Sequence, residues 1–352
     1  MRGREDRLAA LVAERELDLL LVTHLVNVRY LTGFGGTNGA CVCSGDTRLF
    51  LTDFRYTERA AAEVEGWEVV TVRDVWIAGL AGRLSGKVGF EDDHLSVRSL
   101  AKLEEAIGEG TELVPAGGLV EQLRRVKDEQ EIAAIAAAAE LADGVYEFAV
   151  EQGLSGRTES DVARSAVARM RELGAEPSFP PIVAAGANGA LPHAEPGGRR
   201  IEKGELVVFD MGALLDGYCS DCTRTYATGE VSADAREVYE LVRRAQAAAL
   251  EAIGPGKSAR ELDAVARSQI EAAGHGEHFG HGLGHGVGLE VHEAPRLSSR
   301  SEETLQASEV VTVEPGVYVP GSYGVRIEDL VVSTEDGHRN LSGLPKDLQV
   351  VG

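Results

Sequence analysis

The chain has 352 residues, of which 43% are hydrophobic and 26% are charged, values typical of a globular protein with about two domains. Its formal net charge of -22 argues against nucleic acid and anionic membranes as partners, because phosphate binding requires clustered Lys and Arg. The N-terminus enters an amphipathic pattern without an apolar signal segment, and no apolar run reaches the length of a membrane span. We therefore expect a cytoplasmic protein.

The first hundred-odd residues alternate short apolar strands with helices, which predicts a small α/β domain. The pattern predicts helices at 4–15, 57–64, 75–84 and 97–107 and strands at 19–22, 39–43, 48–52, 67–72 and 87–90. Catalytic residue types do not cluster here, and we interpret His24 and His94 as isolated surface or loop histidines.

A charged segment that includes Arg124-Arg125-Val126-Lys127 leads into a long Ala-rich helix, and the pattern of predicted strands and helices changes there. We place the domain boundary at this point, which gives domains 1–122 and 123–352. The second domain is predicted to contain helices at 129–151, 159–173, 232–253 and 258–273, strand material at 179–185, and two hairpins that carry acidic residues. The fold class is therefore α/β with an α+β second part.

The first acidic hairpin carries Asp210 and Asp221 on its two arms, around a turn that contains Asp216-Gly217. The two aspartates are direct cross-strand partners if the turn centres on Leu215-Asp216, and diagonal ones if it centres on Asp216-Gly217. Side-chain alternation puts them on one face in either case. Two buried carboxylates this close together need a cation or a shared proton.

The second acidic hairpin folds about Pro320-Gly321-Ser322, and with Gly321 at its centre Glu314 faces Glu328 across the strands. Tyr318 and Arg326 share that face by alternation. Because Pro315 and Pro320 lie in or next to the arms, a bulge could shift this register.

Histidines occur in two further stretches. A Gly-rich run from His275 to Glu293 contains His281 and His285, and its spacing alone does not decide which of them binds a metal. His193 follows a Gly/Asn turn after the apolar strand material that begins near Phe179. Two Asp, two Glu and at least one His form a donor set suited to two divalent cations of the Mn, Co or Zn type, a pair that supports hydrolysis.

With these motifs the chain resembles the pita-bread metallopeptidases, and within them the Xaa-Pro branch of prolidase and aminopeptidase P. The resemblance covers essentially the whole chain, from the Asn27-Val-Arg-Tyr-Leu-Thr-Gly33-Phe run of a creatinase-like N-terminal domain, through Leu123-Arg-Arg-Val-Lys127, to the second acidic hairpin. It implies a pita-bread catalytic domain, two divalent metal ions per subunit with manganese as the first choice, small proline-containing peptides as substrates, and a homodimer.

The resemblance also implies a role for each matching residue. Asp210 would bind one metal, His285 and Glu314 the other, and Asp221 and Glu328 would bridge them. Glu314 would act as general base and then acid, and His193 and His292 would bind the substrate carbonyl and the developing oxyanion. The wall of the proline pocket and its supporting residues would be Phe179, His281, Tyr318 and Arg326, and Thr223 would supply a supporting hydroxyl.

Arg296 in His292-Glu-Ala-Pro-Arg296 resembles the arginine with which prolidases bind the free carboxylate of a dipeptide. This residue favours an Xaa-Pro dipeptidase over an aminopeptidase P that acts on longer peptides, and both remain open because similar arginines occur in short aminopeptidases. Methionine aminopeptidase fits less well, given the large N-terminal domain and the Tyr318 and Arg326 pair. A non-enzymatic binding module of the same fold is the remaining alternative.

Overall fold

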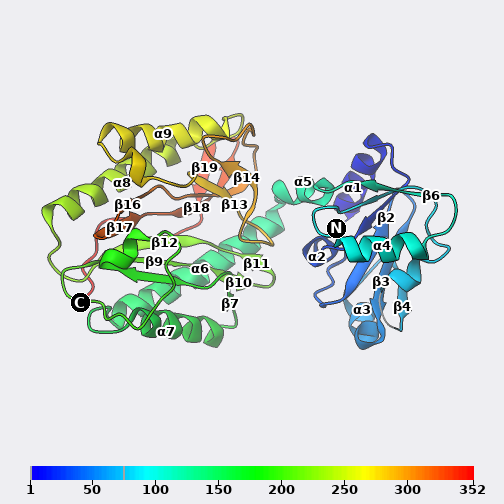
Figure 1. Cartoon of the computed structure of the whole chain (residues 1–352), viewed down its shortest axis with the longest axis horizontal. Coiled ribbons are helices and arrows are strands. Elements are labelled where there is room, and N and C mark those ends of the chain that lie inside the picture. Colours follow the sequence, from blue (N-terminus) through cyan, green and yellow to red (C-terminus); the bar gives the residue numbers. More distant parts are fainter. Residues whose placement is uncertain (1, 74–75) are drawn as a thin grey trace. The chain divides into compact units, whose positions relative to one another are not determined.

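The computed structural model describes residues 2–73 and 76–352. The chain folds into two compact units, Met1–Arg124 and Arg125–Gly352 (Figure 1). None of the helices in the described residues combines the length and the apolar composition that crossing a bilayer requires.

The first unit is an α/β sheet domain. Its elements are α1 (Arg2–Glu14), β1 (Leu19–Val22), α2 (Leu25–Thr32), β2 (Gly39–Cys43), β3 (Arg48–Asp53), the 3₁₀ helix η1 (Phe54–Tyr56), α3 (Thr57–Glu63), β4 (Glu68–Val72), η2 (Trp76–Leu80), β5 (Gly86–Phe90), α4 (Val97–Ala106) and β6 (Thr111–Pro115). The six strands form one sheet in the order β4-β3-β2-β1-β5-β6, in which β1, β2 and β3 pair antiparallel and the outer pairs are parallel. A short helix, α5 (Leu119–Arg125), comes next in the chain.

Most of the strands and helices predicted for this unit are present, with three differences. α2 was not predicted, because Val, Asn, Tyr and Thr are weak helix formers; burial of Val28, Tyr30 and Leu31 stabilises it instead. β6 was not predicted either. The helix predicted at 75–84 begins outside the described residues, and its described part contains only the 3₁₀ helix Trp76–Leu80.

His24 and His94 are not isolated, which corrects the interpretation from the sequence. Their rings stack 3.6 Å apart, and Nε2 of His94 lies 3.7 Å from Oε1 of Glu121. The stacking and the contact with Glu121 bring together residues from three separate segments of the first unit, so residue spacing could not indicate them.

The second unit contains the remaining elements. They are α6 (Glu129–Glu151), α7 (Glu159–Glu172), β7 (Glu176–Pro177), β8 (Ile182–Ala185), η3 (Gly186–Ala190), β9 (Leu206–Met211), β10 (Ala213–Leu215), β11 (Tyr218–Cys219), β12 (Cys222–Ala227), α8 (Ala233–Ala252), α9 (Ala259–Ala272), η4 (Gly276–His278), β13 (Gly284–Gly286), β14 (Glu293–Leu297), β15 (Val310–Val313), β16 (Gly316–Val319), β17 (Tyr323–Arg326), β18 (Asp329–Thr334) and β19 (Gly337–Asn340).

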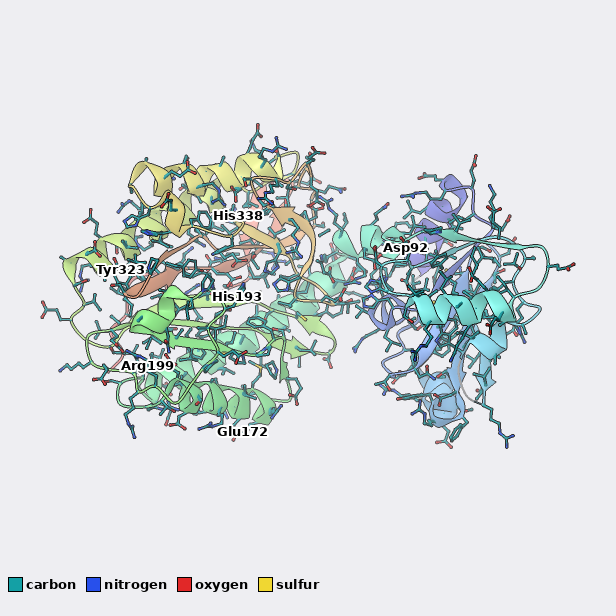
Figure 2. The ribbon with its side chains drawn as sticks, in the orientation of Figure 1. Asp92, Glu172, His193, Arg199, Tyr323 and His338 are labelled. Atoms are coloured by element: carbon teal, nitrogen blue, oxygen red, sulfur yellow. The ribbon has the colours of Figure 1, made fainter. Side chains whose placement is uncertain are left out.

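Strands of the second unit lie between two pairs of helices (Figure 1). One apolar core joins α6 and α7 to β8, β9 and β12, and the other joins α8 and α9 to the strands of the second half. The strand orders are β12-β9-β8, β11-β10-β7, β14-β13-β15-β18-β19 and β16-β17. In Figure 2, His193 lies in the middle of this unit, whereas Glu172 at the end of α7 lies at its rim.

The long helix α6 starts at Asp128, whose carboxylate accepts the N–H of Glu131 while the Glu131 side chain accepts the N–H of Asp128. Its buried Tyr146 hydroxyl lies 2.5 Å from the carbonyl oxygen of Cys222 and accepts the N–H of Met211 at 3.0 Å. This one side chain therefore holds β9 and β12 together immediately beside Asp210 and Asp221.

Candidate metal centre

The first acidic hairpin turns at Asp216 and Gly217, which have φ angles of 49° and 86°. Two positive φ angles are the mark of a two-residue hairpin turn, and Leu215 pairs with Tyr218 on either side of it. The same register continues into β9 and β12, where Thr223 lies opposite Asp210. Of the two registers that the sequence left open, the structure has the one that makes Asp210 and Asp221 diagonal neighbours.

The ladder of this hairpin is interrupted at Gly212, next to Asp221. A Cβ atom at Gly212 would lie 1.7 Å from the carbonyl oxygen of Ser220, so the close approach of the two arms requires glycine. Asp221 consequently lies between β11 and β12 rather than within a strand.

The second acidic hairpin has the register that places Glu314 opposite Glu328. Val319 pairs with Tyr323 across Gly321, and Val313 pairs with Asp329 at the other end. The ladder breaks between these pairs, at Pro315, but the register does not shift. The bulge that the prolines could have caused is therefore absent from these strands.

His285 projects from the strand β13, in which it lies between Gly284 and Gly286. A Cβ atom added at Gly284 would lie 2.0 Å from a backbone carbonyl oxygen, and one added at Gly286 would lie 2.2 Å from another. Its Nδ1–H donates to the carbonyl oxygen of Gly286 at 3.1 Å, which turns Nε2 toward the carboxylates. Nε2 faces Oε1 of Glu314 at 3.2 Å and Oδ2 of Asp221 at 3.6 Å. The structure thus directs His285, rather than His281, toward the carboxylates.

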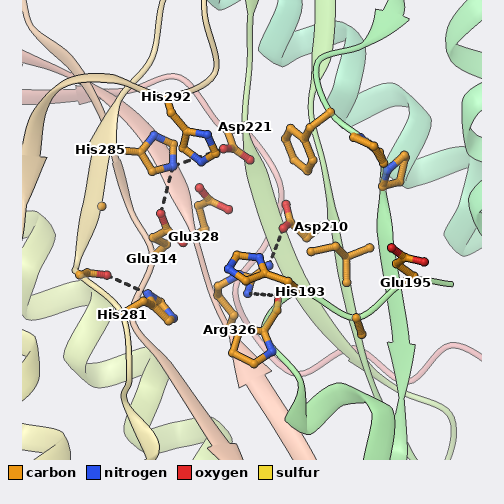
Figure 3. Close-up of a pocket in the computed structure, with 18 of the residues that line it drawn as sticks. His193, Glu195, Asp210, Asp221, His281, His285, His292, Glu314, Arg326 and Glu328 are labelled. Atoms are coloured by element: carbon orange, nitrogen blue, oxygen red, sulfur yellow. Dashed lines mark hydrogen bonds and ion pairs between the residues drawn. The ribbon is translucent and has the colours of Figure 1, made fainter. Parts of the chain in front are cut away.

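Two pairs of carboxylates and one imidazole converge in this place (Figure 3). The exposed fractions of Asp210, Asp221, His285 and Glu328 are 7%, 6%, 7% and 1%. Ligand atoms of Asp221, His285 and Glu328 all lie within 4.8 Å of one another. These residues come from both hairpins and from the Gly-rich strand, so only the tertiary fold assembles them.

Electrostatics at this cluster call for a cation. Burial, together with the neighbouring carboxylates, raises the pKa of Asp221 and of Glu328 well above the usual values. Burial also acts on Glu314, but the hydrogen bond and charge of His285 outweigh it and lower the pKa of Glu314 to about 2. Oδ1 of Asp210 and Oε1 of Glu328 are buried and have no hydrogen-bond partner among the described residues. The donor set therefore fits divalent cations with oxygen and nitrogen ligands.

Arg326 is the hub of a buried network behind the carboxylates. Its guanidinium pairs with Asp210, donates from Nε to the hydroxyl of Thr223 at 2.9 Å, and donates from Nη1 to the hydroxyl of Tyr318 at 2.8 Å. Thr223 in turn donates to Oε2 of Glu328 at 2.7 Å. Arg326 therefore positions two of the carboxylates, in addition to lining the cavity.

The network ends at His281. Its Nδ1–H donates to the carbonyl oxygen of Gly282 at 2.8 Å, so Nε2 accepts the hydroxyl of Tyr318 at 2.9 Å. Burial lowers the pKa of His281 and raises that of Tyr318 to about 12, which keeps the imidazole neutral and the phenol protonated. Tyr318, which the sequence grouped with the substrate-binding residues, does not line the cavity but supports His281 and Arg326, which do.

A cavity of about 710 Å³ opens onto this cluster. Apart from Tyr318 and Thr223, it is lined by every residue that the sequence assigned to the site: Phe179, His193, Asp210, Asp221, His281, His285, His292, Arg296, Glu314, Arg326 and Glu328. His193, His292 and Arg296 are exposed at its edge, and the ring of His292 packs edge-on against His285 with centroids 4.3 Å apart.

Sequence reasoning missed several residues at the site, and three of them are Thr312, Ile182 and Glu195. Thr312 accepts the N–H of His285 and donates to Oε1 of Glu314, both at 3.0 Å. Ile182 lies opposite Asp210 in the β8–β9 pair, and Glu195 lines the cavity two residues after His193. Of these, only Glu195 could have been found from the sequence, because it lies two residues after His193. The contacts of Thr312 and Ile182 depend on strand pairing.

Comparisons with known proteins agree with this geometry. A family model described as "Metallopeptidase family M24" matches residues 133–335, and one described as "Creatinase/Prolidase N-terminal domain" matches residues 4–126. A curated relative, "Uncharacterized peptidase YqhT" of Bacillus subtilis (strain 168), is 41% identical and the match covers 98% of this chain and 99% of the relative.

Two solved structures are similar over nearly the whole chain. The Xaa-Pro dipeptidase from Bacillus anthracis has a TM-score of 0.96 and 40% identity, with 99% of each chain covered. The X-Pro aminopeptidase from Thermotoga maritima MSB8 has a TM-score of 0.90 and 36% identity, with 96% of this chain and 99% of that chain covered.

Proposed function

Because the chain belongs to metallopeptidase family M24 and carries the creatinase/prolidase N-terminal domain, we propose that it is an Xaa-Pro dipeptidase with two divalent metal ions in its second unit. A similar structure, at 40% identity, is named as such a dipeptidase. A second structure, at 36% identity, is named as an X-Pro aminopeptidase, so the class of peptide must be argued from the site.

The residues that would hold the metals are Asp210, Asp221, His285, Glu314 and Glu328. Two bound cations would activate water and polarise the scissile carbonyl. Hard oxygen donors dominate this set, which favours manganese over softer ions, with cobalt and zinc as the alternatives. The homodimer implied by family resemblance belongs to the same proposal and is tested by sedimentation.

The other residues of the cavity then have distinct tasks. Glu314, which lies 3.2 Å from Nε2 of His285, takes the proton of the attacking water and passes it to the leaving nitrogen. This transfer is needed because the imide nitrogen of proline must be protonated as it leaves. His193 and His292, exposed at the edge of the cavity, bind the carbonyl oxygen and the negative charge that develops on it. Phe179 contributes the apolar surface that a proline ring needs.

The position of Arg296 is the observation that favours a dipeptidase. Arg296 lies directly opposite His285 in the β13–β14 pair, so both side chains leave the same face of the sheet. Its guanidinium lines the cavity and makes no hydrogen bond or ion pair with the other described residues. A guanidinium without a partner beside the metal-type cluster suits the free carboxylate of a dipeptide, which it can bind with two hydrogen bonds.

The test compares hydrolysis of an Xaa-Pro dipeptide with that of the tripeptide Xaa-Pro-Yaa, on protein stripped of metal and refilled with Mn, Co or Zn. We expect the dipeptide to be preferred, and Arg296→Ala to raise KM for the dipeptide while leaving the tripeptide little affected. A preference for the tripeptide would assign the chain to the aminopeptidases instead, and hydrolysis of neither with any metal would refute the proposal.

A further inference from the structure

Glu195 is a carboxylate of the cavity that the proposed mechanism does not use. Its side chain is exposed and lines the cavity (Figure 3), but it makes no hydrogen bond or ion pair with the described residues. The carboxylates at the proposed metal centre, by contrast, are buried among each other and around Arg326 and His285.

The loop that carries Glu195 is held at both ends. The carbonyl oxygen of Pro192 accepts a hydrogen bond from Nη1 of Arg326 at 3.3 Å. At the other end, the N–H of Gly197 donates to the Glu159 carboxylate, and the carbonyl oxygen of Gly197 accepts the N–H of Ser160. The residue before Glu195, Ala194, is buried with 8% exposure, and all residues from Pro192 to Pro196 line the cavity. Pro196 further restricts the backbone of Glu195 to extended conformations.

The strand order shows where the apolar part of the cavity lies. Asp210 in β9 has Thr223 of β12 as its partner on one side and Ile182 of β8 on the other. Ile182 and the preceding cavity residues Pro180 and Pro181 therefore form an apolar wall beyond Asp210, about one strand spacing, roughly 4.8 Å, further from β12.

Figure 3 shows Glu195 and His285 on opposite sides of the cavity, with Asp210 between them. Arg296 lies at the His285 end, because the two residues are cross-strand partners. The cavity is thus charged at both ends, with a guanidinium at one end and an unpaired carboxylate at the other.

A dipeptide has one direction in such a cavity, and this step rests on the proposed function. With the proline carboxylate bound to Arg296 and the scissile bond at the metal centre, the residue before proline extends past Asp210. Its side chain then reaches the apolar wall and Glu195. A long side chain with a cationic end matches both features, because its methylene groups can pack on Ile182 and the prolines while its charge meets the carboxylate.

We propose that Glu195 determines specificity for the residue before proline, and that it selects Lys-Pro and Arg-Pro over dipeptides with a neutral side chain of the same length. Because Glu195 is exposed, the ion pair is partly screened by solvent, and we expect a preference of about two- to five-fold.

The experiment measures kcat/KM for Lys-Pro, norleucine-Pro and Glu-Pro with the metal-loaded protein at low and high salt. Norleucine has the length of lysine without its charge. The wild type should favour Lys-Pro over norleucine-Pro, less so at high salt. Glu195→Gln should bring the ratio close to one, and Glu195→Lys should favour Glu-Pro. The matched control is Glu202→Gln, which removes the same charge from an exposed residue outside the cavity and should keep the wild-type ratio.

Two results would overturn the assignment of Glu195. A Lys-Pro to norleucine-Pro ratio that is the same in the wild type and in Glu195→Gln would show that the carboxylate does not meet the side chain. An equal loss for all three dipeptides in Glu195→Gln would show that it binds the α-amino group, which every dipeptide carries. Either result leaves Xaa-Pro hydrolysis standing, whereas no hydrolysis of any dipeptide by any variant would refute the proposed function as well.

Discussion

Asp221 and Glu328 are buried beside further carboxylates, and this arrangement is unfavourable unless positive charge lies between them. His285 supplies one nitrogen donor, and the guanidinium of Arg326 is already engaged by Asp210 and by two hydroxyl groups. Bound cations would supply the remaining charge, and Asp221 and Glu328, as the proposed bridging carboxylates, would then be essential.

Replacing either bridging carboxylate by its amide should therefore abolish the metal centre. We expect Asp221→Asn and Glu328→Gln to lose bound metal and to lower kcat/KM by several orders of magnitude. Metal content and peptide hydrolysis measure both effects. Asp216→Asn is the control, because Asn also tolerates the positive φ of 49° in the turn; activity of all three variants at the same level would refute the ligand assignment.

Thr223 links Arg326 to Glu328 through a single hydroxyl group. Thr223→Val keeps the shape but removes the hydroxyl, which leaves a buried guanidinium N–H and a carboxylate oxygen without this partner. We expect metal affinity to fall by about 10- to 100-fold, as measured by titration with Mn. Thr223→Ser should restore most of the affinity, and a serine variant as weak as the valine variant would show that packing of the methyl group matters instead.

At the scale of elements, the two acidic hairpins share a construction. Each keeps one register along its length, and each has a break in its ladder where carboxylates lie, near Gly212 and Asp221 in one and near Glu314 and Glu328 in the other. The backbone N–H of Glu328 donates to the carbonyl oxygen of Thr223, which joins the second break to β12. The breaks free these residues from regular strand pairing, so their side chains can turn toward one point.

The first break depends on a glycine, and its replacement should be costly. In Gly212→Ala the new Cβ would lie 1.7 Å from a backbone oxygen, so the hairpin must open. We expect Tm to fall by more than 10 °C, roughly the effect of 3 to 5 kcal/mol in a unit of this size, together with loss of activity.

Gly144→Ala is the control within the same unit. Gly144 lies inside α6, and an added Cβ would meet nothing within 4 Å. Because Gly is a poor helix former, this variant should gain about 0.5 to 1 kcal/mol. Equal stabilities of the two variants in urea unfolding would contradict the close approach at Gly212.

At the scale of the whole molecule, all proposed metal ligands belong to the unit Arg125–Gly352, and Met1–Arg124 contributes none of them. Cations that bind only the folded protein stabilise it by mass action, by about 2.7 kcal/mol at a concentration of 100 times Kd. When the cations are removed, repulsion among the buried carboxylates lowers the stability of the folded protein further.

Removal of metal should therefore loosen the second unit selectively. We expect a chelator to lower amide protection from hydrogen exchange in the strands β9, β12, β15 and β18, while β1, β2 and β5 keep theirs. Readdition of Mn should restore the protection. An equal loss in both units, or none in either, would argue against a metal centre built only from the second unit.

Residue pattern alone predicted both acidic hairpins, because period-two alternation and turn residues such as Asp216-Gly217 and Gly321 act locally, but it did not decide their registers. It was sufficient for most helices because their signals are also local, and it failed at α2, where burial of Val28 and Tyr30 outweighs weak helix propensity. The roles of single residues were available only through family resemblance.

The amino-acid sequence by itself determined the family and the domain types, and it contained the acidic and histidine residues from which a metal centre could be proposed, since these follow from local motifs. Only the tertiary structure decided that Nε2 of His285 faces the carboxylates, that Arg326 joins Asp210 to Thr223 and Tyr318, and that Glu195 faces the far end of the cavity. The physical reason is that each of these arrangements depends on segments more than ten residues apart, which are brought together by strand pairing and by the burial of two separate cores.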